Sequence, residues 1–133
     1  MKYIKEYNEY VDPFNEDDWD EVEPKFLVWL KINYPDESKW KDITRIDCSN
    51  QKLTDLIGID KLINLDILNC STNQLTELDL SKNIKLIELF CDNNQLIELD
   101  LTKNIELKTL YCFNNQIIEL DISKNIKLRY KYI

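Results

Sequence analysis

Four cysteines recur at nearly equal intervals, and thiolates are strong ligands for zinc. Cys48, Cys70, Cys91 and Cys112 are separated by 22, 21 and 21 residues, and no C-x-x-C pair occurs. If they occupy one position in successive strands about 4.8 Å apart, their sulfurs form a line about 14 Å long. Zinc needs ligands that converge on one point, and aligned parallel neighbours do not offer ideal disulfide geometry. We therefore predict buried, structural thiols, no metal site and no cofactor.

Two columns of carboxylates recur with the same interval. Paired carboxylates can hydrolyse glycosides or bind calcium. Lysines recur nearby and can screen the carboxylates, and we expect them on an exposed, convex face with no pocket. We interpret them as a solvated ladder, with weak calcium binding as the alternative. The carboxylates are Glu77, Glu98 and Glu119 with Asp79, Asp100 and Asp121, and the lysines are Lys82, Lys103 and Lys124.

Other catalytic constellations are absent from the sequence. There is no histidine, which removes the commonest general base and the Ser-His and Cys-His nucleophile pairs. A single glycine, Gly58, cannot supply a glycine-rich phosphate loop. We therefore do not predict an enzyme, although a carboxylate-based one stays the least favoured alternative.

The cysteine spacing belongs to a 21-residue repeat. Each repeat contains the template L-x-x-L-x-L-x-x-N twice: Leu86, Leu89, Cys91 and Asn94 fill it once, and residues 96–104 fill it again. Alternating apolar and polar residues predict a short strand with one buried face, and the asparagine marks a turn. One repeat is therefore two short strands and two corners, and stacked repeats form parallel ladders around a shared core.

The corner asparagines are predicted to be structural rather than a polar binding site. An inward amide can bond the exposed backbone of the corner, whereas a buried amide without such bonds would cost about 1–3 kcal/mol. The first corner holds Asn73, Asn94 and Asn115, and the second holds Asn83, Asn104 and Asn125.

This pattern resembles leucine-rich repeats over residues 43–133. The doubled template resembles the IRREKO variant found in bacterial and viral proteins, which together with the Lys, Ile and Asn content suggests a bacterial or giant-virus type. The first repeat differs, because Gln51 replaces the asparagine and its second half, residues 53–62, is one residue longer. That repeat resembles the internalin-like 22-residue type, whose outer side is a short helical turn. We expect the convex side to change from 3₁₀ helix to strand after residue 75.

The expected fold is α/β leaning towards all-β. It is a short, curved leucine-rich-repeat solenoid with parallel strands on the concave and partly on the convex side, and an α-helical N-terminal cap. Residues 1–42 form the cap and residues 43–133 form about four and a half repeats, in one continuous domain. The resemblance implies protein–protein binding through the concave sheet.

The cap is expected to contain two helices. Pro13 closes the first, and Asp17 or Asp18 caps the second, which tolerates Pro24 near its start. One face of the second helix should cover the end of the first repeat, helped by Trp40. A helix that instead reaches for a partner is the alternative. The first helix presents Tyr3, Ile4, Tyr7, Tyr10 and Val11, and the second presents Val22, Phe26, Trp29 and Leu30.

The chain is acidic, with a formal net charge of −8. A negative chain repels a phosphate backbone, so nucleic acid is not an expected partner. No apolar run is long enough to span a membrane, and residues 1–7 carry charges where a signal peptide is apolar. We expect a cytoplasmic protein in a reducing compartment, or one in the host cytoplasm if the source is viral.

The outward residues of the first-half strands supply the candidate binding site. The early repeats are polar there, whereas the later ones bring aromatic side chains together on one exposed sheet. Aromatic side chains are enriched at interface hot spots, although mutual stacking that only stiffens the sheet is the alternative. The acidic neighbours favour a protein partner with apolar groups and some positive charge. The candidates are Phe90, Tyr111, Phe113, Tyr130 and Tyr132, with Glu88 and Asp92.

The last repeat begins a fifth first-half strand in which Lys131 occupies a leucine position. A lysine can blunt an edge strand against further pairing. The same edge could instead pair with a second copy. A homodimer, or a structural, self-associating element that uses this open C-terminal edge, is therefore the second functional hypothesis.

Overall fold

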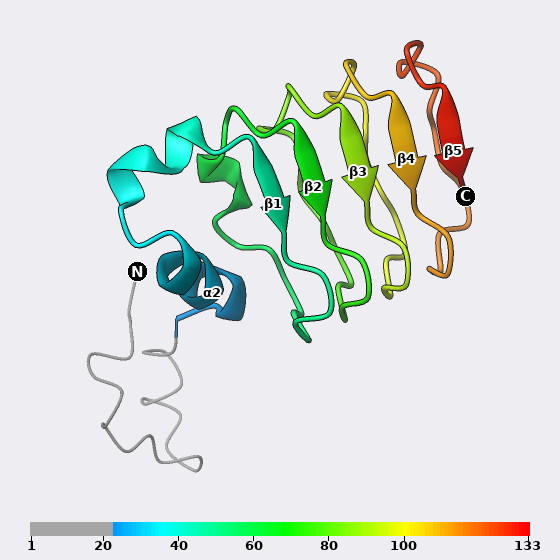
Figure 1. Ribbon diagram of the computed structural model, residues 1–133. Coiled ribbons are helices and arrows are strands. Elements are labelled where there is room, and N and C mark those ends of the chain that lie inside the picture. The colour runs from blue at the N-terminus through cyan, green and yellow to red at the C-terminus, as the bar shows by residue number, and fades with distance from the viewer. Residues whose placement is uncertain (1–22) are drawn as a thin grey trace.

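The computed structural model describes residues 23–133 and shows a solenoid whose strands form one sheet (Figure 1). The five strands are parallel, and their order in the sheet equals their order in the chain. Each connection must therefore return behind the sheet before the next strand begins. The predicted leucine-rich-repeat solenoid is confirmed. The strands are β1 (Arg45–Asp47), β2 (Ile67–Asn69), β3 (Glu88–Phe90), β4 (Thr109–Tyr111) and β5 (Tyr130–Tyr132).

The strands pair in the register that the repeat length sets. Ile67 pairs with Arg45 in β1 and with Glu88 in β3, so equivalent residues of successive repeats lie side by side. The middle residue of β1 to β4 is buried, and its two neighbours face outward. In β5 the middle residue is Lys131, which is exposed. The core therefore lies behind the sheet, between the two halves of each repeat.

The four cysteines lie one after another in that core. Each follows its strand, and the amide of Cys91 donates to the carbonyl of Tyr111 in the next repeat (2.8 Å). All four thiols are free and buried. Burial raises the pKa of the Cys48 thiol to about 12, and burial and the neighbouring cysteines raise the pKa of Cys70 well above its ordinary value. These thiols are therefore protonated, small apolar groups at neutral pH.

The buried asparagine amides join neighbouring repeats at both corners. At the first corner, Asn94 Nδ2 donates to the carbonyls of Cys70 (3.0 Å) and Cys91 (3.1 Å), and its Oδ1 accepts from the amide of Leu75 (3.0 Å). Asn73 and Asn115 bond in the same way. At the second corner, Asn83, Asn104 and Asn125 each donate to two carbonyls of the preceding repeat.

The side opposite the sheet differs in part from the expectation. The first repeat has the predicted 3₁₀ turn, η2 (Ile59–Lys61), which Gly58 precedes with φ 110°. After residue 75, however, the described second halves contain no strand. Each second half donates one backbone hydrogen bond to the preceding repeat, such as that from Gln95 N–H to the carbonyl of Leu75 (2.8 Å). The aspartate that follows then accepts a hydrogen bond from its own turn, as Asp79 does from the amide of Ser81. A strand ladder would need those groups to bond the neighbouring repeat instead.

Helical segments cover the N-terminal end of the solenoid, as Figure 1 shows. The α-helix α2 (Lys25–Asn33) buries Phe26, Leu27 and Leu30 completely, and the 3₁₀ helix η1 (Glu37–Asp42) buries Trp40. The Trp40 Nε1–H donates to the carbonyl of Tyr34 (2.8 Å).

The start of the second helix was predicted too early. Pro24 is the N-cap, with extended geometry (ψ 137°), and α2 begins at Lys25. Glu23, which precedes the proline, is disfavoured in helical geometry, so the helix does not continue back past it. Neither Asp17 nor Asp18 can therefore cap this helix. These two residues, Val22 and the predicted first helix lie outside the described residues.

We expect Asn94→Ala to lower the free energy of unfolding by about 1–3 kcal/mol, because it leaves buried backbone groups of two repeats without partners. Urea denaturation monitored by circular dichroism measures this change. Gln95→Ala is the matched control, because Gln95 is exposed and its backbone bond survives. A stability of Asn94→Ala equal to that of the control would contradict the bridging role of the amide.

The buried thiols predict a loss of stability at alkaline pH. Their pKa values are raised above the 9.0 of an exposed thiol, so their contribution is complete below pH 9 and falls as the pH rises toward the folded values. Denaturation at about pH 8 and about pH 10 should show a steeper fall for the natural chain than for Cys70→Ala/Cys91→Ala. Equal pH dependence of the two proteins would mean that the thiols ionise freely in the fold.

Candidate functional site

Three neighbouring strands bring aromatic rings into contact on the outer face of the sheet. Phe90, Tyr111 and Tyr132 are paired residues of β3, β4 and β5. The Tyr111 ring centroid lies 5.0 Å from that of Phe90 and 4.5 Å from that of Tyr132. Phe113, two residues beyond Tyr111, lies 6.3 Å from the Tyr111 ring. We call these four residues the aromatic patch; Tyr111 is at its centre.

The sheet geometry explains why these rings meet while Tyr130 stays apart. Parallel pairing aligns equivalent outward residues, and the next outward residue along a strand is about 6.6 Å away. Tyr130 pairs with Thr109, so it belongs to the neighbouring column. It takes part in none of the ring contacts found within residues 23–133. Tyr132 and Tyr130 are 55% and 62% exposed, whereas the other three rings are half-buried.

Two carboxylates flank the aromatic patch along β3. Glu88 and Asp92 are half-buried and lie two residues before and two residues after Phe90. Asp92 Oδ2 accepts a hydrogen bond from Asn93 Nδ2 (2.8 Å). Partial burial, then the adjacent Tyr132 and then Asp92, raise the pKa of Tyr111. The Tyr111 hydroxyl therefore stays protonated at neutral pH, and it is engaged with the neighbouring Tyr132.

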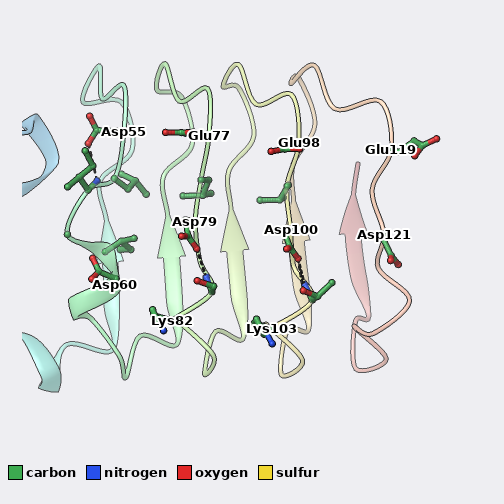
Figure 2. Close-up of a pocket in the computed structure, with 18 residues that line it drawn as sticks. Asp55, Asp60, Glu77, Asp79, Lys82, Glu98, Asp100, Lys103, Glu119 and Asp121 are labelled. Carbon is green, nitrogen blue, oxygen red and sulfur yellow. Dashed lines mark hydrogen bonds between the residues drawn. The ribbon is translucent and has the colours of Figure 1, made fainter.

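The carboxylate columns were expected on an exposed, convex face with no pocket, but they line an open groove of about 1090 Å³ opposite the sheet (Figure 2). Asp55 and Asp60 of the first repeat extend the two columns, and the sequence analysis did not single them out. Leu56, Leu78 and Leu99 lie between the columns and are at most 9% exposed. The groove therefore has a leucine floor and acidic walls.

Three aspartates of the groove, Asp79, Asp100 and Asp121, have lowered pKa values and are not poised to donate protons. The pKa of Asp79 is lowered first by the hydroxyl and then by the backbone amide of Ser81, and the turns at Asp100 and Asp121 repeat this arrangement. Glycoside hydrolysis needs a carboxylic acid whose pKa is raised. None of the ion pairs within the described residues includes a groove carboxylate. The three aspartates are therefore negatively charged at neutral pH, and Lys82, Lys103 and Lys124 lie close enough to help lower their pKa values.

Neither a metal site nor a membrane-spanning helix was found in the described part of the chain. Across residues 23–133, no three potential ligands from Cys, Asp and Glu are placed to hold a metal ion. Over the same range, no helix combines the length and apolar character that crossing a bilayer requires.

Comparison with known proteins relates the chain to internalins. No family model matches the sequence. The chain is 43% identical over 47 residues to internalin J of Listeria monocytogenes serotype 4b (strain F2365), a stretch that covers 35% of this chain and 5% of that protein. The chain thus spans only a small part of this curated relative.

Solved structures extend the likeness over most of the chain. The functional domain of InlJ from Listeria monocytogenes, described as including a cysteine ladder, superposes with a TM-score of 0.69 and 42% identity; the match covers 71% of this chain and 21% of that one. An internalin (inlF) from Listeria monocytogenes str. 4b F2365 gives a TM-score of 0.73 over 83% of this chain and 36% of that one, at 24% identity, which supports the fold alone. Sequence and fold together support a leucine-rich repeat protein with an internalin-like solenoid.

Proposed function

We propose that the protein is a protein–protein interaction module that binds its partner on the concave face through the aromatic patch. One observation carries the proposal: Tyr111 contacts three other rings on an outward sheet face, so the rings form one contiguous surface. Rigid aromatic side chains bury large areas at little entropic cost, which makes them effective interface anchors. The likeness to internalin repeats supports protein interaction as the general role.

The charges around the aromatic patch define the partner that we expect. Glu88 and Asp92 make no recorded ion pair within residues 23–133, so a partner with apolar groups and some positive charge can satisfy them. The net charge of −8 disfavours nucleic acid. We place the protein in a reducing, intracellular environment, with the host cytoplasm as the location if the source is viral. Four free, buried thiols suit such an environment.

The second candidate is self-association through the C-terminal edge of the sheet. The observation that favours it is the exposure of this end: Ile117, Leu120, Ile122 and Leu128 are half-buried, whereas their counterparts one repeat earlier are buried. Lys131 at the leucine position of β5 disfavours close packing there. A monomeric mass by light scattering at high protein concentration would remove this candidate.

We expect Tyr111→Ala and Phe113→Ala each to weaken partner binding by about 30-fold or more, as loss of a hot-spot ring does. A pull-down with mass spectrometry identifies the partner, and titration calorimetry then measures its affinity for each variant. Ile97→Ala is the control, because Ile97 is 63% exposed and belongs to the second-half side. Thermal unfolding confirms that the variants fold. Undiminished retrieval of the same partner by both aromatic variants would exclude the aromatic patch as the site.

A further inference from the structure

Three aromatic rings and one carboxylate lie at neighbouring positions on the outer face of the sheet, two in each of two successive repeats. Phe90 and Asp92 belong to one repeat, and Tyr111 and Phe113 are their counterparts in the next. Asn93 N–H donates to the carbonyl of Phe113 (3.0 Å), which keeps the two repeats aligned past the ends of β3 and β4. We call these four residues the ring–carboxylate site.

Asp92 is placed differently from the equivalent residues of the first two repeats. In the second repeat, Asn69 accepts hydrogen bonds from the amide (3.1 Å) and the hydroxyl (2.7 Å) of Ser71, and the first repeat contains the same turn. In the third repeat, Phe90 stands at the position of the acceptor and Asp92 at that of the serine. The ring cannot accept these bonds and the carboxylate has no hydroxyl to donate, so the turn bond is lost and Asp92 is released from it.

Two asparagines hold the Asp92 carboxylate from the side of the corner. Asn93 Nδ2 donates to Asp92 Oδ2 (2.8 Å), and Asn114 Nδ2 donates to Asn93 Oδ1 (2.9 Å). Both asparagines have the left-handed conformation, with φ 55° and φ 52°, which asparagine tolerates better than most residues. Among the hydrogen bonds of residues 23–133, none reaches the other oxygen of Asp92, Oδ1. The carboxylate is therefore held in place with one oxygen available to a ligand.

The described part of the chain supplies no cation to this site. The corner segments that follow β2, β3 and β4 contain no lysine or arginine; they are residues 71–76, 92–97 and 113–118. None of the ion pairs found within residues 23–133 includes Asp92, and no cation–π contact found there involves a ring of the aromatic patch. After burial and the neighbouring Tyr132, Asp92 contributes to the raised pKa of Tyr111, so its negative field reaches the central ring.

The geometry of the site fits one cationic side chain. The Tyr111 ring plane is tilted by 61° to that of Phe90 and by 49° to that of Phe113, so neither ring stacks flat on the Tyr111 ring. Adjacent strands are about 4.8 Å apart and successive outward residues about 6.6 Å apart, so a group above the centre of the site lies laterally about 4 Å from each of the four positions. A cation is attracted to a ring face within about 6 Å of its centroid.

We propose that the ring–carboxylate site receives an arginine side chain of the partner protein, with its guanidinium over the rings and hydrogen-bonded to Asp92 Oδ1. This inference rests on the proposed function and names the residue that anchors the partner. Arginine suits the site better than lysine, because its planar group stacks on rings, donates several hydrogen bonds in one plane and is less strongly hydrated than an ammonium group. Glu88, on the other side of Phe90, adds a second negative charge.

Two blocked tripeptides that differ in one group test the arginine on the full chain. Acetyl-Leu-Arg-Leu-amide carries the guanidinium, whereas acetyl-Leu-citrulline-Leu-amide has nearly the same shape and no charge. In a ¹H–¹⁵N NMR titration, the arginine peptide should shift the backbone amides of Phe90, Tyr111 and Asp92. The citrulline peptide should bind at least about fivefold more weakly, because it lacks the cation–π and ionic attraction. Added salt should reduce this difference.

Three variants assign the preference to the site. Asp92→Asn should bind the two peptides equally, because the amide oxygen still accepts the bond from Asn93 but the charge is gone. Asp60→Asn is the matched control: it removes the same charge at an exposed position in the groove opposite the sheet, and should keep the natural preference for arginine. Tyr111→Ala should bind both peptides more weakly, because the central ring is lost.

Equal binding of the two peptides to the natural chain would overturn the arginine assignment. So would a preference for arginine that survives in Asp92→Asn, or an arginine peptide that leaves the three amides unmoved. Retrieval of the natural partner by Tyr111→Ala tests the proposed function separately. If this variant loses the partner while the two peptides bind equally, the aromatic patch is an interface with an apolar anchor and only the arginine is wrong. If Tyr111→Ala and Phe113→Ala both keep the partner, the proposed function itself fails.

Discussion

The register between successive repeats is the constraint on which every other feature depends, and the buried asparagine amides hold it. Asn94 bonds the backbone of its own repeat and of the preceding one, and Asn104 donates to two carbonyls of the preceding repeat at the opposite corner. Because an unpartnered buried amide is costly, a shift of one residue would break bonds at both corners and turn core side chains outward. The leucines supply the apolar area, whereas the amides determine which leucine lies over which.

That register turns single residues into surfaces. Aligned repeats place Phe90, Tyr111 and Tyr132 in contact although 21 residues separate each from the next. The same alignment produces the acidic groove on the other side of the molecule. A solenoid thus obtains several distinct surfaces from small differences among equivalent positions, since a change in one repeat always lies beside the same position of its neighbours.

The sequence predicted most where periodicity alone decides the outcome. The solenoid, its parallel sheet and the positions of Cys91 and Tyr111 follow from a 21-residue spacing. It predicted less where local chemistry competes with the period. Pro24 moves the helix start to Lys25, and the turn at Asp79 takes up bonds that a convex strand would need. The groove was missed because the pattern shows which residues align but not whether the surface between two columns is hollow.

The location of the four cysteine sulfurs tests the stacking of the repeats most directly. Sulfur anomalous scattering from crystals of the protein would place each atom without reliance on the fold. The account predicts a single row of four buried sulfurs about 4.8 Å apart, in the order Cys48, Cys70, Cys91 and Cys112. Sulfurs that cluster around one point, or that lie on different faces of the molecule, would contradict the stacking and remove the aromatic patch with it.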